Sequence, residues 1–310
     1  MLLVDFELNE SFASPLSSLD SAIIQYNFNG QTNQPFQSPF NAASSLVWKP
    51  TYPTEEQYKE AFELVQKGLS RGDSYLLNLT FPTTIKTNWD LITVFEQTSA
   101  SYKLWWKDQF TVFSPESFVQ INNNKIFSYP MKGTLPATLP PQILLDNFKE
   151  KAEHATIVDL IRNDLSMVAQ KVQVDRYRYL DRLNTNQVDL WQTSSQISGE
   201  LPTNYHQNLG DIIFKLLPAG SISGAPKPAT LTTIKQAEKQ KRGFYSGVAF
   251  LWDGYKLDSC VLIRFLQKTQ KNFQYWSGGG ITANSNWKEE YKELKEKVYL
   301  PTVQESYTKV

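Results

Sequence analysis

Two pairs of glutamates are spaced so that each could contribute to a metal site. Glu150 and Glu153 lie three residues apart where apolar residues recur every three or four positions, and Glu290 and Glu293 repeat this spacing later in the chain. Residues three apart share one face of a helix, so each pair could direct its carboxylates to one point. Carboxylate oxygens are ligands that Mg²⁺ prefers. Two such helices facing each other would form a magnesium site, although the same spacing is common on solvated helix faces.

A lysine next to a glycine is the second candidate for chemistry. Lys132 and Gly133 follow a strand predicted at residues 125–129. Glycine lets backbone approach closely, and a lysine that is shielded from water there would have a nucleophilic amine. The alternative is an ordinary surface turn.

Three further features could recognise an anion. Small residues at 218–227 precede a predicted helix, whose N-terminus would present free N–H groups. Gly278, Gly279 and Gly280 end an aromatic strand and indicate either close backbone approach to another group or a tight turn. Arg264 is predicted to lie within an apolar strand. A buried arginine needs an anionic partner, which could be a ligand carboxylate or an internal acid.

The composition excludes several classes of protein. The 310 residues carry 31 basic and 31 acidic side chains, so no net positive charge is available to hold nucleic acid or an anionic membrane. The basic stretch 235–242 is interrupted by Glu238 and is interpreted as a solvated helix face. No apolar run is long enough to span a bilayer, and the N-terminus lacks a basic leader. Two histidines are too few for a multi-histidine metal site, and the single Cys260 suits a reducing cytoplasm.

Helices and strands must position these residues, and hydrophobic periodicity predicts where they lie. Helices are expected at 147–168, 207–216, 230–240 and 286–298, and one more after a capping box at Thr54–Gln57; strands are expected at 75–79, 109–113, 125–129, 247–252, 259–267 and 273–276. Strands and helices intermingle without regular β-α alternation, which favours an α+β fold. We predict a short N-terminal segment, 1–50, packed on a main catalytic domain, 51–310.

Taken together, the motifs resemble those of the chorismate-binding enzyme family. The resemblance rests on Ser114–Ser117, Pro130–Thr134, Glu153–Leu165, Gly220–Lys227, Tyr245–Gly247, Asp258–Arg264 and Gly278–Ile281, followed by Glu290 and Glu293. It implies a fold of two layered, mostly antiparallel β-sheets flanked by outer helices, with the active site between the sheets.

Three positions distinguish the branches of this family. Lys132 matches the lysine that is typical of aminodeoxychorismate synthases, where anthranilate and isochorismate synthases have alanine. Gln192 stands where anthranilate synthases have a histidine associated with loss of pyruvate, and Leu76 stands where isochorismate and salicylate synthases have a water-activating lysine. All three favour the branch that adds ammonia to chorismate on the route to p-aminobenzoate and folate. The alternatives are anthranilate synthase component I and a catalytically silent subunit that binds chorismate.

The resemblance also implies a role for each site residue. Magnesium would be bound by Glu153 and Glu293 with Glu150 and Glu290 behind them, Lys132 would be the nucleophile and Glu116 the acid, and the substrate would be held by Ser221, Tyr245, Arg264 and the backbone of Gly278, Gly279 and Gly280. No segment resembles a glutaminase, so we expect a separate glutamine amidotransferase subunit to deliver ammonia.

Overall fold

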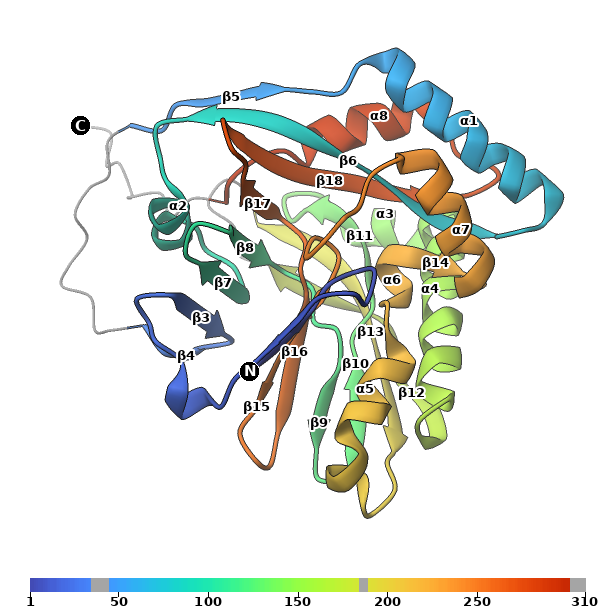
Figure 1. Ribbon diagram of the computed structural model, residues 1–310. Coiled ribbons are helices and arrows are strands. Elements are labelled where there is room, and N and C mark those ends of the chain that lie inside the picture. The colour runs from blue at the N-terminus through green and yellow to red at the C-terminus, as the bar shows by residue number, and fades with distance from the viewer. Residues whose placement is uncertain (35–44, 184–188, 302–310) are drawn as a thin grey trace. The chain divides into compact units, whose positions relative to one another are not determined.

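The computed structural model describes residues 1–34, 45–183 and 189–301 (Figure 1). The chain forms two compact units, each assembled from separate segments. Unit 1 joins Met1–Glu116, Ile222–Ala249 and Cys260–Thr302, and unit 2 contains Ser117–Ser221 and Phe250–Ser259. The predicted division at residue 50 stays a prediction, and residues 35–44, 184–188 and 302–310 of the two predicted parts lie outside the described residues.

Unit 1 is organised around an antiparallel sheet with the strand order β14-β6-β18-β17-β8-β7-β3-β4, in which β5 also pairs with β6. Its strands are β3 (Ile24–Phe28), β4 (Gln31–Thr32), β5 (Trp48–Thr51), β6 (Leu76–Thr87), β7 (Tyr102–Trp106), β8 (Phe110–Ser114), β14 (Gly224–Ala225), β17 (Phe265–Lys268) and β18 (Phe273–Ile281). This unit also contains β1 (Leu2–Val4) and β2 (Ser11–Ala13), which pair with each other and, in the strand order of the second sheet, follow β15; a 3₁₀ turn at Leu16–Ser18 comes after them.

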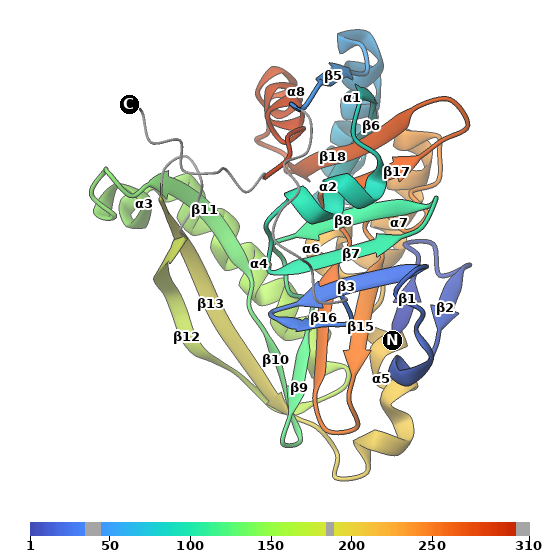
Figure 2. The ribbon, with the colours of Figure 1, turned by 90° about the vertical axis from the view of Figure 1, so that its left-hand side faces the viewer.

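Helices cover the long strands of this sheet. The helices α1 (Glu55–Arg71), α7 (Lys227–Glu238) and α8 (Trp287–Glu296) pack on β6 and β18, whereas α2 (Leu91–Gln97) lies across β7 and β8 (Figure 2). α1 begins where the sequence predicts. The Thr54 hydroxyl accepts a hydrogen bond from the Gln57 N–H, and the Gln57 side chain accepts one from the Thr54 N–H. Beneath α2 an aromatic core gathers Trp89, Phe95, Trp105, Phe113 and Tyr275.

Unit 2 contains a second antiparallel sheet, with the strand order β11-β13-β10-β9-β16, and β12 pairs with β13. The strands are β9 (Gln120–Asn122), β10 (Lys125–Ser128), β11 (Met131–Pro136), β12 (Gln170–Leu183), β13 (Leu190–Glu200) and most of β16 (Leu257–Val261); β15 (Val248–Trp252) begins in unit 1 and ends in unit 2. The helix α4 (Phe148–Ser166) packs along β11, β12 and β13 and is preceded by the short α3 (Gln142–Asp146). A 3₁₀ turn (Tyr205–Asn208), α5 (Leu209–Leu216) and the start of α6 (Gly220–Ser223) follow β13.

These elements confirm the predicted α+β class with two antiparallel sheets and flanking helices. The helices predicted at 147–168 and 286–298 are α4 and α8. Two predictions were wrong. The strand expected at 259–267 is interrupted, because Arg264 adopts φ +53° between β16 and β17. The stretch 235–242 is not a wholly solvated helix face, since α7 ends at Glu238, and Glu238 and Arg242 are buried.

Candidate functional site

Lys132 lies on β11, which pairs with the strand that carries Gln192. In the ladder between β11 and β13, Lys132 is opposite Thr193 and Thr134 is opposite Gln192. The register shifts between Lys132 and Thr134, so Gly133 forms a bulge. The Thr193 hydroxyl donates a hydrogen bond to the Lys132 carbonyl, which fixes the backbone at the lysine. Lys132 and Gln192 are therefore neighbours across two paired strands.

Gly133 brings the first glutamate pair up to the lysine. Its φ of +73° lies in the left-handed region, and a Cβ atom at this position would be 2.6 Å from Glu150 Oε2. Only glycine satisfies both the dihedral angle and the close carboxylate. Glu150 lies in the first turn of α4, where the Asn147 side chain accepts its N–H, and Glu153 follows one turn later with Lys149 Nζ 3.9 Å away. Lys132 and the Glu150–Glu153 pair thus occupy the same corner of unit 2.

A polar group that the sequence analysis missed lies in this corner. His154 is completely buried, and its Nε2 is 2.7 Å from the Ser195 hydroxyl, which also accepts the Arg178 N–H. The Arg178 guanidinium donates to the carbonyls of Leu144 and Leu145, which end α3. Burial, together with the charges of Arg178 and Lys132, lowers the pKa of His154 to about 4. The signal for this group was present in the sequence, since His154 has the helical spacing of a core residue.

In unit 1 the second glutamate pair lies over the glycine strand. A Cβ atom at Gly279 would be 3.3 Å from Glu290 Oε2 and 3.6 Å from Glu293 Oε1, so the missing side chain leaves room for both carboxylates. Lys297 was not among the predicted residues. Its ammonium is 2.6 Å from Glu293 Oε1 and donates to the Gly278 carbonyl at 2.8 Å. The position of Lys297 four residues after Glu293 could have indicated this pair.

Arg264 and Tyr245 lie near the same strand. Arg264 donates to the Lys297 carbonyl and its guanidinium lies 4.8 Å from the centre of the Tyr299 ring. Among the described residues no carboxylate pairs with Arg264, so the internal acid considered from the sequence is not found there. The Tyr245 ring stacks on Trp276, with the ring centroids 5.1 Å apart. Burial raises the pKa of Tyr245 to about 12, which keeps the hydroxyl protonated and able to donate a hydrogen bond.

The remaining predicted residues lie at the ends of elements. Glu116 follows β8; its N–H donates to the Ser114 hydroxyl and its carbonyl accepts the Val261 N–H. Ser221 is half-buried in α6. The predicted site is therefore divided between the units, as Glu116, Tyr245, Arg264, the three glycines, Glu290 and Glu293 belong to unit 1, and Lys132, Glu150, Glu153 and Ser221 belong to unit 2.

The described part of the chain holds neither a preformed metal centre nor a membrane-spanning helix. No three His, Cys, Asp or Glu side chains gather there as a preformed metal site, so the magnesium site stays a prediction. No helix in the described part of the chain is both long enough and apolar enough to cross a membrane.

Comparison with known proteins places these features in a family. Residues 6–302 match the family described as chorismate binding enzyme. An "Uncharacterized PabA-like protein" of Haemophilus influenzae is 50% identical over 96% of this chain and 91% of its own length. Aminodeoxychorismate synthase component 1 of Salmonella typhimurium is 31% identical over 91% of this chain and 64% of its own length. Among solved structures, anthranilate synthase component I of Streptococcus pneumoniae superposes with a TM-score of 0.69 at 25% identity, covering 82% of this chain and 59% of that one.

Proposed function

Because this chain belongs to the chorismate-binding enzyme family, we propose that it is the aminating component of an aminodeoxychorismate synthase, which converts chorismate and ammonia to 4-amino-4-deoxychorismate. The observation that carries the proposal is the pairing of β11 with β13. It places Gln192 next to the residue opposite Lys132, and at both of these positions the sequence departs from the anthranilate branch. The match to the Salmonella enzyme over most of the chain supports the same branch.

Lys132 is the proposed nucleophile. Its amine forms a bond to ring carbon C2 of chorismate, both ring double bonds shift by one position toward C4, and the C4 hydroxyl leaves as water after taking a proton from Glu116; the lysine nitrogen gives up a proton. Ammonia then bonds to C4, both double bonds shift back, and the C2–nitrogen bond to Lys132 breaks as that nitrogen takes up the proton that ammonia loses. Two easier displacements replace one difficult one, which is the general advantage of covalent catalysis. Gln192 has no imidazole to move the proton that pyruvate loss requires, so the product keeps its enolpyruvyl group.

Four glutamates are the proposed magnesium ligands and their supports. Carboxylate oxygens suit Mg²⁺, and one oxygen each of Glu290 and Glu293 approaches Gly279, 3.3 and 3.6 Å from where a Cβ atom would lie. The Lys297 ammonium against Glu293 indicates that this position attracts a cation. When bound, the ion would hold the ring carboxylate and stabilise the charge that gathers on it.

The enolpyruvyl side of the substrate is assigned to Arg264, Tyr245 and the glycine strand of unit 1. The Arg264 guanidinium, which has no carboxylate partner among the described residues, is suited to bind the enolpyruvyl carboxylate. The protonated Tyr245 hydroxyl and the backbone N–H groups of the glycine strand are further donors on this side.

Ammonia is proposed to come from a separate glutamine amidotransferase. A glutaminase needs an accessible nucleophilic cysteine, and Cys260, the one cysteine of the chain, is buried in β16. Free ammonium at high concentration should replace the partner in a test.

The decisive experiment is mass analysis of the products that purified protein forms from chorismate, Mg²⁺ and ammonium at alkaline pH. The wild type should form 4-amino-4-deoxychorismate, and Lys132→Ala should lose this activity. Lys125→Ala, on the exposed start of β10, is the matched control and should keep it. Anthranilate with free pyruvate would assign the chain to the other branch. No consumption of chorismate, even with a glutaminase subunit added, would contradict an enzymatic role.

A further inference from the structure

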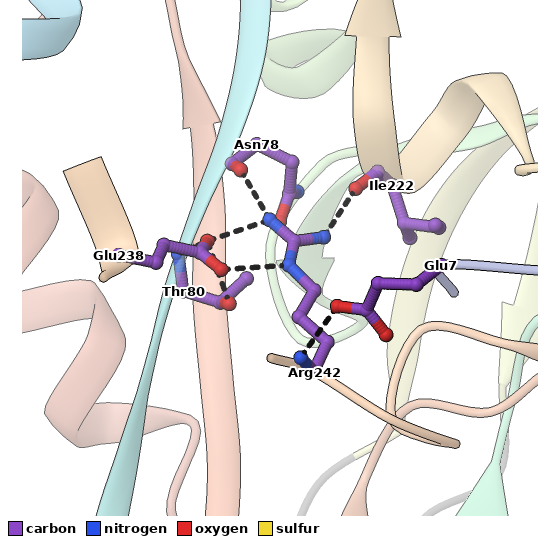
Figure 3. A network of polar contacts seen from close by, with 6 residues as sticks. All are labelled: Glu7, Asn78, Thr80, Ile222, Glu238 and Arg242. Carbon is purple, nitrogen blue, oxygen red and sulfur yellow. Dashed lines mark hydrogen bonds and ion pairs between the residues drawn. The ribbon is translucent and has the colours of Figure 1, made fainter. Parts of the chain in front are cut away.

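A completely buried ion pair lies in unit 1, outside the set of residues assigned to the reaction. The side chains of Glu238 and Arg242 are 0% and 1% exposed (Figure 3). The guanidinium donates from Nε to Glu238 Oε2 at 2.9 Å and from Nη2 to Glu238 Oε1 at 2.6 Å. It also donates to the carbonyls of Ile222 and Asn78, and the Phe6 ring lies 4.3 Å from its centre. The pair therefore connects α7 to two other segments of unit 1.

On β6 the pair binds backbone groups beyond the point where β14 stops. β14 pairs with Leu76 and Leu77. Further along, the Asn78 carbonyl accepts from Arg242, and the N–H and hydroxyl of Thr80 both donate to Glu238 Oε1 at 2.9 Å. The two side chains thus take the place of a neighbouring strand for this part of β6.

This contact shows which groups of the glycine strand face away from β6. In the ladder between β6 and β18, Asn78 is opposite Gly280 and Thr80 is opposite Gly278. Antiparallel ladders alternate hydrogen-bonded and non-hydrogen-bonded pairs. Since Asn78 and Thr80 direct their backbone groups to the ion pair, these two pairs are of the non-hydrogen-bonded kind. The N–H groups of Gly278 and Gly280 consequently point to the other edge of β18, where Lys297 reaches the Gly278 carbonyl.

The pair also holds the chain next to two other candidate substrate residues. The Ile222 carbonyl that accepts from Arg242 follows Ser221 directly in α6. On the other side of Arg242, the Glu7 carboxylate accepts the N–H groups of Arg242 and Gly243, two residues before Tyr245. The guanidinium thus bonds to β6, which pairs with the glycine strand, and to the carbonyl next to Ser221, while the Arg242 backbone, held by Glu7, lies three residues before Tyr245.

We propose that Glu238 and Arg242 are positioning residues that align the Gly278 and Gly280 N–H groups, Ser221 and Tyr245 for binding the substrate. This inference rests on the proposed function for the identity of the substrate. A buried ion pair is weak evidence for stability, because replacing both partners by apolar residues of similar volume is often neutral or stabilising. The bonds of this pair instead hold backbone carbonyls and N–H groups of neighbouring segments in fixed positions.

The test compares the double variant Glu238→Met/Arg242→Met with wild type in three measurements: urea unfolding, the KM and kcat for chorismate, and hydrogen exchange of segments 76–80, 220–225 and 276–281. Lys59→Met/Glu63→Met is the matched control, since it removes an exposed ion pair of the same i,i+4 spacing from α1. Arg242→Lys keeps the charge but lacks the planar fork that reaches Glu238 and both carbonyls at once.

We expect the double variant to unfold at a lower urea midpoint, because the Thr80 N–H and the Asn78 and Ile222 carbonyls lose their hydrogen-bond partners. It should also exchange faster in the three segments. Its folded fraction should lose about tenfold to a hundredfold in kcat/KM, mainly through KM, because small misplacements of binding groups have effects of this size. Arg242→Lys should remain folded yet show a raised KM, and the control should match wild type.

Two results would overturn the inference. One is a double variant with wild-type KM and wild-type exchange in the three segments. The other is a loss of stability with an unchanged KM in the folded fraction, which would make the pair purely structural. If the wild type itself does not consume chorismate, the proposed function fails, and the exchange measurement still decides whether the pair orders these segments.

Discussion

The buried histidine of unit 2 should make the stability of this protein depend on pH between 4 and 7. His154 is uncharged in the folded chain, with a pKa of about 4 in place of 6.5, because it is buried beside the positive charges of Arg178 and Lys132. Unfolding exposes the ring and returns its pKa to the ordinary value. Below pH 6.5 the unfolded chain therefore binds a proton that the folded chain does not, and stability falls as the pH falls.

The size of the effect follows from the two pKa values. A difference of one pKa unit corresponds to about 1.4 kcal/mol, so the full change between pH 6.5 and about 4 is about 3 kcal/mol. By pH 5 about 2 kcal/mol of this should already be lost. Well above pH 6.5 His154 takes nothing from the unfolding free energy, and the full loss is reached below the pKa of the folded protein.

The assay is urea unfolding followed by tryptophan fluorescence from pH 7.5 to 5, in EDTA so that metal binding does not contribute. Carboxylates also titrate at low pH, so the relevant quantity is the difference in unfolding free energy between wild type and His154→Gln at each pH. This difference should shift by about 2 kcal/mol in favour of the variant as the pH falls to 5. His206→Gln controls for the loss of an imidazole, since His206 is exposed. A difference that stays constant across this range would refute the reasoning.

Three further predictions concern backbone geometry, capping and the metal. Gly133→Ala should lower the unfolding free energy by about 1–3 kcal/mol, because Gly133 has a positive φ and a carboxylate lies next to it. Gly210→Ala, in a helix with open space around it, should raise the unfolding free energy by about 0.5–1 kcal/mol. Urea midpoints measure both changes. Thr54→Ala should cost about 1 kcal/mol by removing the capping box of α1, and unchanged thermal unfolding would contradict this. Lys297→Met should tighten Mg²⁺ binding about two- to fivefold in calorimetry, because an exposed ion pair of ~0.5–1 kcal/mol no longer competes for Glu293, and weaker binding would argue against this competition.

Periodicity and capping predicted the longer helices of this chain, whereas the short helices α2 and α3 were not predicted. Thr54 and Gln57 indicated the start of α1, and the spacing of apolar residues located α4 and α8. These signals are local, since a helix forms its hydrogen bonds and buries its apolar face within one stretch of sequence. The glutamate pairs could be predicted for the same reason, as residues three apart on a helix share a face.

The features that depend on pairing between distant strands could not be predicted in this way. β12 was missed because charged residues such as Arg176, Arg178 and Arg182 obscure the alternation of a half-buried strand. The break at Arg264 was missed because nothing in an apolar run signals a non-glycine residue with positive φ. The proximity of Lys132 to Gln192 depends on the register of β11 and β13, which a single sequence does not specify.

The buried pair Glu238–Arg242 illustrates a different limit. Charges four residues apart usually indicate an exposed helix face, and the neighbouring lysines at 235, 239 and 241 are indeed exposed. Burial of this pair follows from the backbone groups of β6 that need partners, and those lie far away in the sequence.

The interleaved layout of the two units has a consequence for synthesis of the chain. β6 has its longest pairing with β18, in which Leu77 is opposite Ile281, so these two strands cannot complete their pairing until the chain as far as Ile281 has left the ribosome. Contacts between residues so far apart in sequence make folding slow, because the loop must close before the pairing stabilises it. During this interval the edge of β6 is exposed to other strands and vulnerable to aggregation. Slower translation would not protect it, whereas a chaperone that binds nascent chains would.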